Sequence, residues 1–147
     1  MMEEKAGGCQ CGRIRYSVRI EDHDAYLCHC RMCQRATGGV SIAFKSVAKA
    51  ALTWQHEPDW YRSSLIARRP FCSACGTPLG FAFPDSDAMD LTVGSFDDPS
   101  AFRPVRHYAT ESMHEASIDT RTLPRIRSEE NANVVQRWID ACGKPPD

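Results

Sequence analysis

Apolar and polar residues alternate through several segments of the first two thirds of the chain. Between Arg13 and Ile20 the even-numbered residues are apolar and the odd-numbered residues are polar. A two-residue period is typical of a strand with one buried and one solvated face. The same period recurs at Val40, Ile42 and Phe44, at Leu79, Phe81 and Phe83, and at Met89, Leu91 and Val93. The pattern therefore predicts a mainly β protein.

Turn-forming residues separate these alternating segments. They occur at Gly38-Gly39, at Pro84-Asp85 and at Asp97-Asp98-Pro99. Glycine, proline and aspartate are the residues that tight turns favour. We therefore expect mostly antiparallel sheets.

Helical periodicity is clear only near the C-terminus. One apolar stripe is formed by Val134, Val135, Trp138, Ile139 and Cys142. Ser128 is a candidate N-cap, and Gly143 with Pro145 would end the helix. The spacing predicts a helix over about 128–142 that packs on the sheet through this stripe. We expect Cys142, which lacks a cysteine neighbour, to be a small buried hydrophobe.

Composition and charge reduce the number of functions to be considered. A chain of 147 residues suits a single domain, residues 1–147. The formal net charge of −1 gives no reason to expect nucleic-acid binding, and no apolar run has transmembrane length. The first residues lack the apolar core of a secretory signal, so we expect a cytoplasmic protein without a membrane partner.

Eight cysteines then become the most informative residues. Cytosolic thiols stay reduced, which favours metal ligands over disulfides. Disulfides in a protein exported by another route are the alternative. Seven of the cysteines form three clusters, at Cys9-x-Cys11, at Cys28-x-Cys30-x-x-Cys33 and at Cys72-x-x-Cys75.

The first and third clusters each supply two sulfurs. Side chains two apart on an extended segment share a face, so Cys9 and Cys11 can reach one ion. The turn of Cys72-x-x-Cys75, followed by Gly76, also aims two sulfurs at one point. Two such pairs would make a closed, structural zinc site.

The second cluster supplies three sulfurs within six residues. Three protein ligands and a free position are typical of catalytic zinc. His29 or a distant histidine could instead close the site, and an iron–sulfur cluster is a further alternative. Spacing also allows another grouping, in which Cys9, Cys11, Cys28 and Cys30 share one ion and Cys33, Cys72 and Cys75 hold the other.

An open zinc with three thiolates favours sulfur chemistry. The three negative sulfurs weaken the ion as an activator of water, whereas zinc accepts thiolates readily. A substrate sulfur is therefore the expected fourth ligand. Making or breaking a carbon–sulfur bond is the reaction that this arrangement suggests.

The cysteine motifs resemble those of the glutathione-dependent formaldehyde-activating enzyme family, which includes centromere protein V. The resemblance runs from about Gly7 to Pro124. It rests on Gly8-Cys9-x-Cys11-Gly12, Cys28-His29-Cys30-x-x-Cys33, Phe71-Cys72-x-x-Cys75-Gly76-x-x-Leu79, Phe102-Arg103-Pro104-x-x-His107 and Leu123-Pro124.

This resemblance implies a β-tent fold of antiparallel sheets stapled by zinc, with a core at about 7–124 and a short C-terminal helix. It implies two zinc ions, a structural one on Cys9, Cys11, Cys72 and Cys75 and a catalytic-type one on Cys28, Cys30 and Cys33. The implied activity is that of a carbon–sulfur lyase acting on a small thiol adduct, such as glutathione with formaldehyde or another aldehyde. Gln34-Arg35 stand where members often carry Arg-Lys, which leaves the substrate open.

Three histidines and two arginines are further candidates for the same site. We expect His29 to point away from the sulfurs, as a supporting or surface residue. His107 and His114 could exchange protons, although a plain surface or core role is the default. Arg68 and Arg69 could neutralise substrate carboxylates or the four-cysteine site, or form a solvated pair. A zinc-stabilised binding module and a thiol or redox sensor are the alternative functions.

Overall fold

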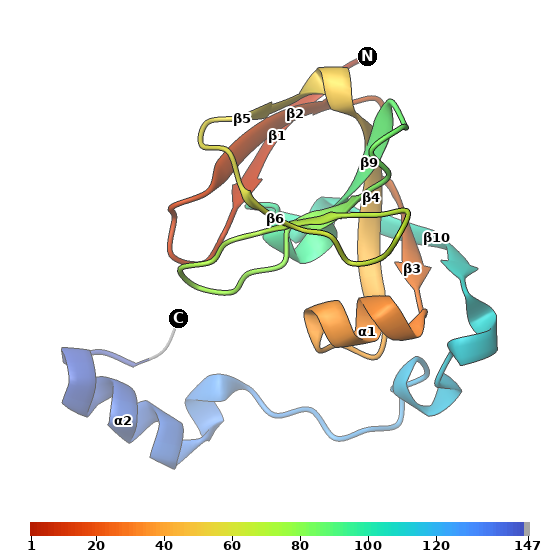
Figure 1. Ribbon diagram of the computed structural model, residues 1–147. Coiled ribbons are helices and arrows are strands. Elements are labelled where there is room, and N and C mark those ends of the chain that lie inside the picture. Colours follow the sequence, from red (N-terminus) through yellow and green to blue (C-terminus); the bar gives the residue numbers. More distant parts are fainter. Residues whose placement is uncertain (146–147) are drawn as a thin grey trace. The chain divides into compact units, whose positions relative to one another are not determined.

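Strands dominate the computed structural model, which describes residues 1–145 (Figure 1). The ten strands of this range are β1 (Glu3–Gly8), β2 (Arg15–Ile20), β3 (Asp24–Cys28), β4 (Ile42–Ala48), β5 (Leu52–Trp54), β6 (Asp59–Tyr61), β7 (Arg69–Phe71), β8 (Gly80–Ala82), β9 (Ala88–Thr92) and β10 (Arg103–Tyr108). Two α-helices accompany them, α1 (Arg31–Thr37) and the C-terminal α2 (Ala132–Cys142). The predicted mainly β fold with a short C-terminal helix is confirmed.

The strands form three sheets. Their strand orders are β1-β2-β5, β10-β3-β4-β9-β8 and β6-β7. The pairs are antiparallel, as predicted, except that β10 runs parallel to β3. This exception places the end of β10 beside the end of β3, with Tyr108 opposite Cys28.

The first alternating segment folds as its pattern predicts. Ile14, Tyr16, Val18 and Ile20 are each at most 4% exposed and belong to the main core. The Tyr16 ring packs edge-on against Trp54 and Phe96, with ring centroids 5.4 and 5.6 Å apart. Burial of these even-numbered side chains fixes the register of β2, because a one-residue slip would turn them all to solvent.

The five-stranded sheet separates the main core from a second apolar cluster. Ala25, Val47, Ala82, Met89 and Leu91 join the main core. Alternate residues of these strands join the second cluster, which consists of Cys28, Cys33 and Phe44 with Tyr26, Cys30, Ile42 and Phe81 packed against them. Phe81 and Phe83 therefore do not share the interior face with Leu79. Ala82 fills the core position of β8 instead.

The chain divides into two compact units, Met1–Ser117 and a second that begins at Ile118. In the second unit, a 3-10 turn at Ser128–Glu130 precedes α2. Asn131, rather than Ser128, caps α2, because its side chain accepts a hydrogen bond from the Val134 amide. Gly143 ends the helix with a φ of 78°, as predicted.

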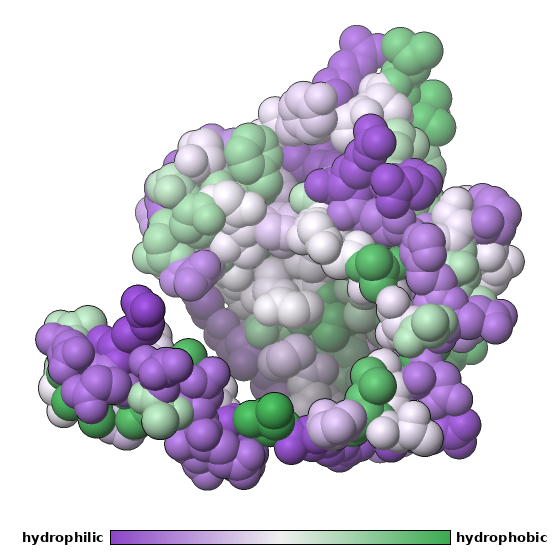
Figure 2. All heavy atoms as spheres, turned by 90° about the horizontal axis from the view of Figure 1, so that it is seen from below, coloured by the Kyte–Doolittle hydropathy of each residue, from purple (hydrophilic) through white to green (hydrophobic). Residues whose placement is uncertain are grey.

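We expected the apolar stripe of α2 to be buried, but its side chains are largely exposed. Trp138 and Ile139 are 48% and 42% exposed, and Cys142 is exposed as well. The prediction of a buried Cys142 was wrong, because the stripe reflects the period of the helix and not the packing of its face. Hydrophobic side chains also reach the surface of this unit in Figure 2. Among residues 1–145, no helix combines the length and the apolar character that crossing a membrane requires.

Candidate metal centres

The loop after β1 and the loop after β7 bring four cysteines together. The sulfurs of Cys9, Cys11, Cys72 and Cys75 all lie within 4.8 Å of one another. Cys11 Sγ lies 3.6 Å from Cys9 Sγ and 3.8 Å from Cys72 Sγ. Sulfurs about 2.3 Å from a tetrahedral zinc ion would be about 3.8 Å apart. The four sulfurs therefore fit a metal ion, and none of these cysteines is joined by a disulfide bond.

Each cysteine pair of this group is followed by a glycine in the left-handed region. Gly12 has a φ of 82° and Gly76 a φ of 80°. A residue with a side chain would be strained there, whereas glycine turns freely. These turns are closed by bonds from the Gly12 amide to the Cys9 carbonyl and from the Gly76 amide to the Cys72 carbonyl. The glycines that follow the motifs thus shape the two loops.

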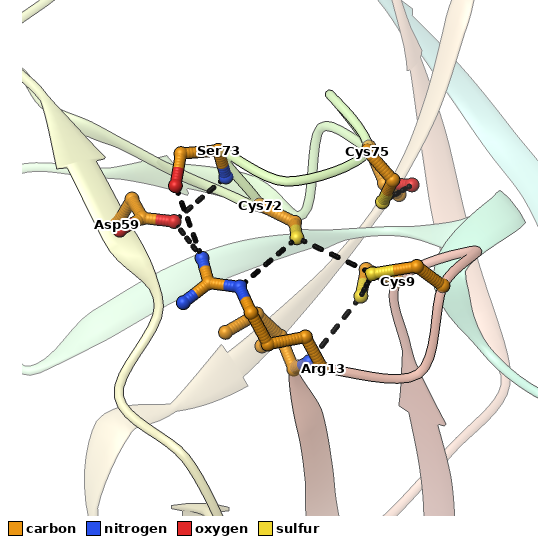
Figure 3. Close-up of polar contacts among 9 residues, drawn as sticks. Cys9, Arg13, Asp59, Cys72, Ser73 and Cys75 are labelled. Carbon is orange, nitrogen blue, oxygen red and sulfur yellow. Dashed lines mark hydrogen bonds and ion pairs between the residues drawn. The ribbon is translucent and has the colours of Figure 1, made fainter.

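Arg13 adds a positive charge to the four-cysteine group (Figure 3). Its Nε atom donates to Cys72 Sγ over 3.4 Å, and its Nη2 atom pairs with Asp59. Asp59 also accepts from the Ser73 amide, and this bond, together with Arg13, lowers the pKa of its carboxyl group. Sequence reasoning missed both residues, because alternation marked Arg13 only as a solvated position of the strand.

The end of β3 and the start of α1 form the second group. The three sulfurs of Cys28, Cys30 and Cys33 lie within 4.8 Å of one another. Cys30 is the N-cap of α1, where its sulfur accepts from the Cys33 amide over 3.3 Å. Cys33 Sγ lies 3.5 Å from Cys28 Sγ, and both residues are buried. This group offers a metal ion three sulfurs.

His29 turns away from these sulfurs, as alternation predicts. Its amide donates to the Tyr108 carbonyl, and its Nε2 atom lies 2.9 Å from His107 Nδ1. The ring is completely buried, so the surface alternative was wrong. Burial lowers the pKa of His29, and the charges of His107 and His114 lower it further. His29 therefore links the three-cysteine loop to β10.

Arg68 and Arg69 separate into different environments. Arg68 is exposed, with its guanidinium 4.0 Å above the Trp60 ring. Arg69 is 6% exposed, and its Nη2 atom lies 3.4 Å from Cys33 Sγ. Its guanidinium also lies 4.9 Å from the centre of the Phe81 ring. Arg69 thus contacts the three-cysteine group, whereas Arg13 provides the cation of the four-cysteine group.

These contacts shift the pKa values of Cys33 and Cys28 in opposite directions. The hydrogen bond from the Cys28 thiol, and then the Arg69 guanidinium, lower the pKa of Cys33 to about 5. The same Cys28–Cys33 contact raises the pKa of Cys28. Without a bound metal ion, these contacts favour the thiolate form at Cys33 over that at Cys28.

A cavity of about 420 Å³ opens beside the three-cysteine group. Its lining includes all three cysteines and Arg69, together with side chains from β3, β4, β8, β9 and β10. Within it, Asp90 Oδ2 accepts from the Tyr26 hydroxyl over 2.8 Å, and Asp90 Oδ1 accepts from Ser46. Alternation along β9 could have predicted that Asp90 lies on the other face of the strand from the buried Met89 and Leu91. It could not have predicted the contact with Tyr26.

Comparisons with known proteins agree with this arrangement. A protein of Schizosaccharomyces pombe named as an uncharacterized lyase is 34% identical over 82 residues, which are 56% of this chain. The chain spans 60% of the length of that curated relative. A crystal structure of a Rhodobacter sphaeroides protein has a similar fold, with a TM-score of 0.57 and 20% identity. That likeness covers 70% of this chain and 99% of the other.

The family model described as glutathione-dependent formaldehyde-activating enzyme matches residues 4–112. This range contains all seven clustered cysteines and His107, whereas Leu123-Pro124 lies beyond it. The match covers most of the chain and both cysteine groups. The chain therefore belongs to the glutathione-dependent formaldehyde-activating enzyme family.

Proposed function

We propose that the protein is a zinc-dependent carbon–sulfur lyase acting on a small thiol adduct, such as glutathione with formaldehyde or another aldehyde. Cys9, Cys11, Cys72 and Cys75 would hold a structural zinc ion. Cys28, Cys30 and Cys33 would hold a catalytic-type zinc ion. Family membership and the relative named as a lyase support this assignment.

The observation that carries the proposal is the difference between the two cysteine groups. Four sulfurs converge in the first group, which satisfies a tetrahedral ion. The second group offers three sulfurs, and it lines a cavity. A ligand entering that cavity can therefore approach the three-cysteine group directly.

The proposed reaction joins a thiol and an aldehyde without any change in oxidation state. The thiol sulfur forms a bond to the carbonyl carbon, and the thiol proton ends on the carbonyl oxygen as a hydroxyl group. In the reverse direction the carbon–sulfur bond breaks, the hydroxyl proton returns to sulfur, and the aldehyde leaves. Bound zinc would hold the substrate sulfur as a thiolate.

The chain's own residues support this chemistry. Arg69 lies beside Cys33 and offsets part of the negative charge that three thiolates bring. The aromatic residues Phe44 and Phe81 pack in one apolar cluster with the cysteines and give the group an apolar flank. Tyr26 and Asp90 present a hydroxyl and a carboxylate in the same cavity, at a distance of 2.8 Å from each other.

Exchange NMR with ¹³C-formaldehyde and glutathione tests the proposal. Wild-type protein should accelerate exchange between free formaldehyde and S-hydroxymethylglutathione. The Cys33→Ser variant should lose most of this acceleration. Cys142→Ser is the matched control, because Cys142 lies outside both groups, and it should retain full activity.

The same samples separate the alternative functions. Metal analysis and X-ray absorption with added glutathione report on the metal shells. A new sulfur ligand at one ion supports the enzyme. If both ions keep four unchanged ligands and the protein does not accelerate exchange, the protein is a zinc-stabilised binding module. If an oxidant releases the metal and no turnover is found, the protein is a thiol or redox sensor.

A further inference from the structure

We infer that the adduct bound beside Cys28, Cys30 and Cys33 carries an apolar, and preferably aromatic, group on its aldehyde-derived carbon. This inference rests on the proposed function and specifies its substrate class. It comes from the walls of the cavity rather than from the cysteines.

Aromatic side chains make up much of those walls. The cavity lining includes Tyr26, Phe44, Phe81, Phe83 and Tyr108. The Phe81 and Phe83 rings meet edge-on with centroids 5.0 Å apart. Tyr26 lies 5.7 Å from Phe44 and 6.4 Å from Tyr108, between ring centroids. The rings thus pack against one another along the cavity wall, and they can offer their free faces and edges to the ring of a ligand.

The apolar lining continues to the exposed rim. Met32, Ile66, Phe83 and Tyr108 line the cavity and are between 42% and 67% exposed. Exposed apolar side chains gathered around one cavity mark a place where a ligand removes them from water. Their position next to the three cysteines indicates that this ligand is the substrate itself.

Four charged residues line the cavity, and the two that are more buried already have partners. Arg69 contacts Cys33, and Asp90 accepts from Tyr26 and Ser46. Arg106 and Glu111 are the other charged lining residues, and both are exposed. The Arg106 guanidinium lies 5.2 Å from the Tyr26 ring centre. The charged ends of glutathione would therefore lie toward the rim, and the interior is left for an apolar group.

The volume of the cavity points the same way. A volume of about 420 Å³ lies within the range of sites that bind small organic ligands, about 300–1,000 Å³. Formaldehyde adds only one carbon and one oxygen to a thiol. At the aldehyde-derived carbon, such an adduct places only hydrogens and a hydroxyl group against the aromatic wall, whereas an adduct of an aromatic aldehyde places a ring there.

Stable thioethers test this inference apart from turnover. S-benzylglutathione and S-methylglutathione differ only in the group whose size and polarity are in question. Calorimetric titration of the zinc-loaded wild-type protein should give at least about tenfold tighter binding of the benzyl compound. Equal affinities, or tighter binding of the methyl compound, would overturn the inference.

Two neighbouring exposed residues provide a matched pair of variants. Ile66 lines the cavity, whereas its more exposed neighbour Leu65 does not. Ile66→Ser should reduce the preference for the benzyl compound several-fold, and Leu65→Ser should leave it unchanged. An equal loss in both variants would contradict the assignment of the cavity wall.

The two proposals fail in different ways. Exchange of formaldehyde with glutathione, combined with no preference for the benzyl compound, overturns the substrate class but leaves the lyase standing. Absence of both exchange and thioether binding overturns both. Preferential benzyl binding without formaldehyde exchange supports the substrate class, and turnover should then be found with an aromatic aldehyde.

Discussion

The Nη2 atom of Arg69 lies 3.4 Å from the Sγ atom of Cys33, and both residues are almost completely buried. The Nε atom of the same guanidinium is buried too and has no hydrogen-bond partner among the described residues. A buried charge is costly unless an opposite charge compensates it. Arg69 and a thiolate at Cys33 therefore stabilise each other.

Replacing Arg69 should weaken metal binding at the three-cysteine group. In Arg69→Met, the thiolates lose their buried cation, so we expect zinc affinity of this group to fall by about tenfold or more. Competition with a chromogenic chelator measures this loss. Arg68→Met is the control, because Arg68 stacks on Trp60 away from the cysteines. Equal zinc affinity in wild type and Arg69→Met would show that the contact does not support the metal.

Cysteine substitutions should separate the two groups by their effect on stability. Cys72→Ser removes a ligand that joins two distant loops, so we expect the free energy of unfolding to fall by about 5 kcal/mol or more. Cys33→Ser removes a ligand of a local loop and should cost much less. Denaturant unfolding, with metal content determined on the same samples, measures both effects. Comparable losses in the two variants would contradict the division into a structural and a catalytic ion.

Gly80 should not tolerate a side chain. A Cβ atom on this residue would lie 2.2 Å from the backbone oxygen of Asp90 on the neighbouring strand. Gly80→Ala must push β8 away from β9, which we expect to destabilise the fold by about 2–3 kcal/mol. Gly94→Ala is the matched control, because nothing lies within 4 Å of a Cβ atom there. Similar midpoints of urea unfolding for the two variants would refute this expectation.

The ion pair of Asp22 and Lys45 should make a small, acid-sensitive contribution to stability. Their charged atoms lie 2.5 Å apart, and the Lys45 hydrogen bond holds the pKa of Asp22 below its ordinary value of 3.8. A lowered pKa means that the contribution is present above the ordinary pKa and is lost as the pH falls below it. Asp22 is largely exposed, so at most about 1 kcal/mol is expected.

Comparison of wild type with Asp22→Asn isolates that contribution. The difference in unfolding free energy should be constant near neutral pH and should shrink between about pH 5 and pH 3. Acid-induced loss of zinc affects both proteins and cancels in the difference. A difference that grows on acidification would contradict the sign of the pKa shift.

The correct predictions from the sequence rested mainly on the spacing of the cysteines and on the alternation of apolar and polar residues along β2. Cys28, Cys30 and Cys33 are within six residues, so local geometry alone brings them together. Ile14 to Ile20 show a period that tertiary packing does not alter. The C-terminal helix was predictable in type, whereas the exposure of its stripe was not, since helical period carries no information about what covers a face.

Local sequence patterns could not predict the contacts between strands that are distant in the chain. Arg69 meets Cys33 because β7 passes beside α1, and nothing near Arg69 in the sequence distinguishes it from Arg68. Tyr26 meets Asp90 only because β3, β4 and β9 are neighbours in one sheet. The parallel pairing of β10 with β3 likewise depends on a long connection that no turn motif records.

The wide separation of the four-cysteine ligands in the chain also determines which metal site is completed first during synthesis. Cys11 and Cys72 are 61 residues apart in the chain, yet their sulfurs are 3.8 Å apart in the fold. A ribosome adding about 5–20 residues per second needs roughly 3–12 seconds to cover that interval. Cys28, Cys30 and Cys33 emerge during this delay and can take up a metal ion first. The nascent chain therefore presents its local metal site before its long-range one, and the N-terminal strands become anchored only after the third cluster has left the exit tunnel.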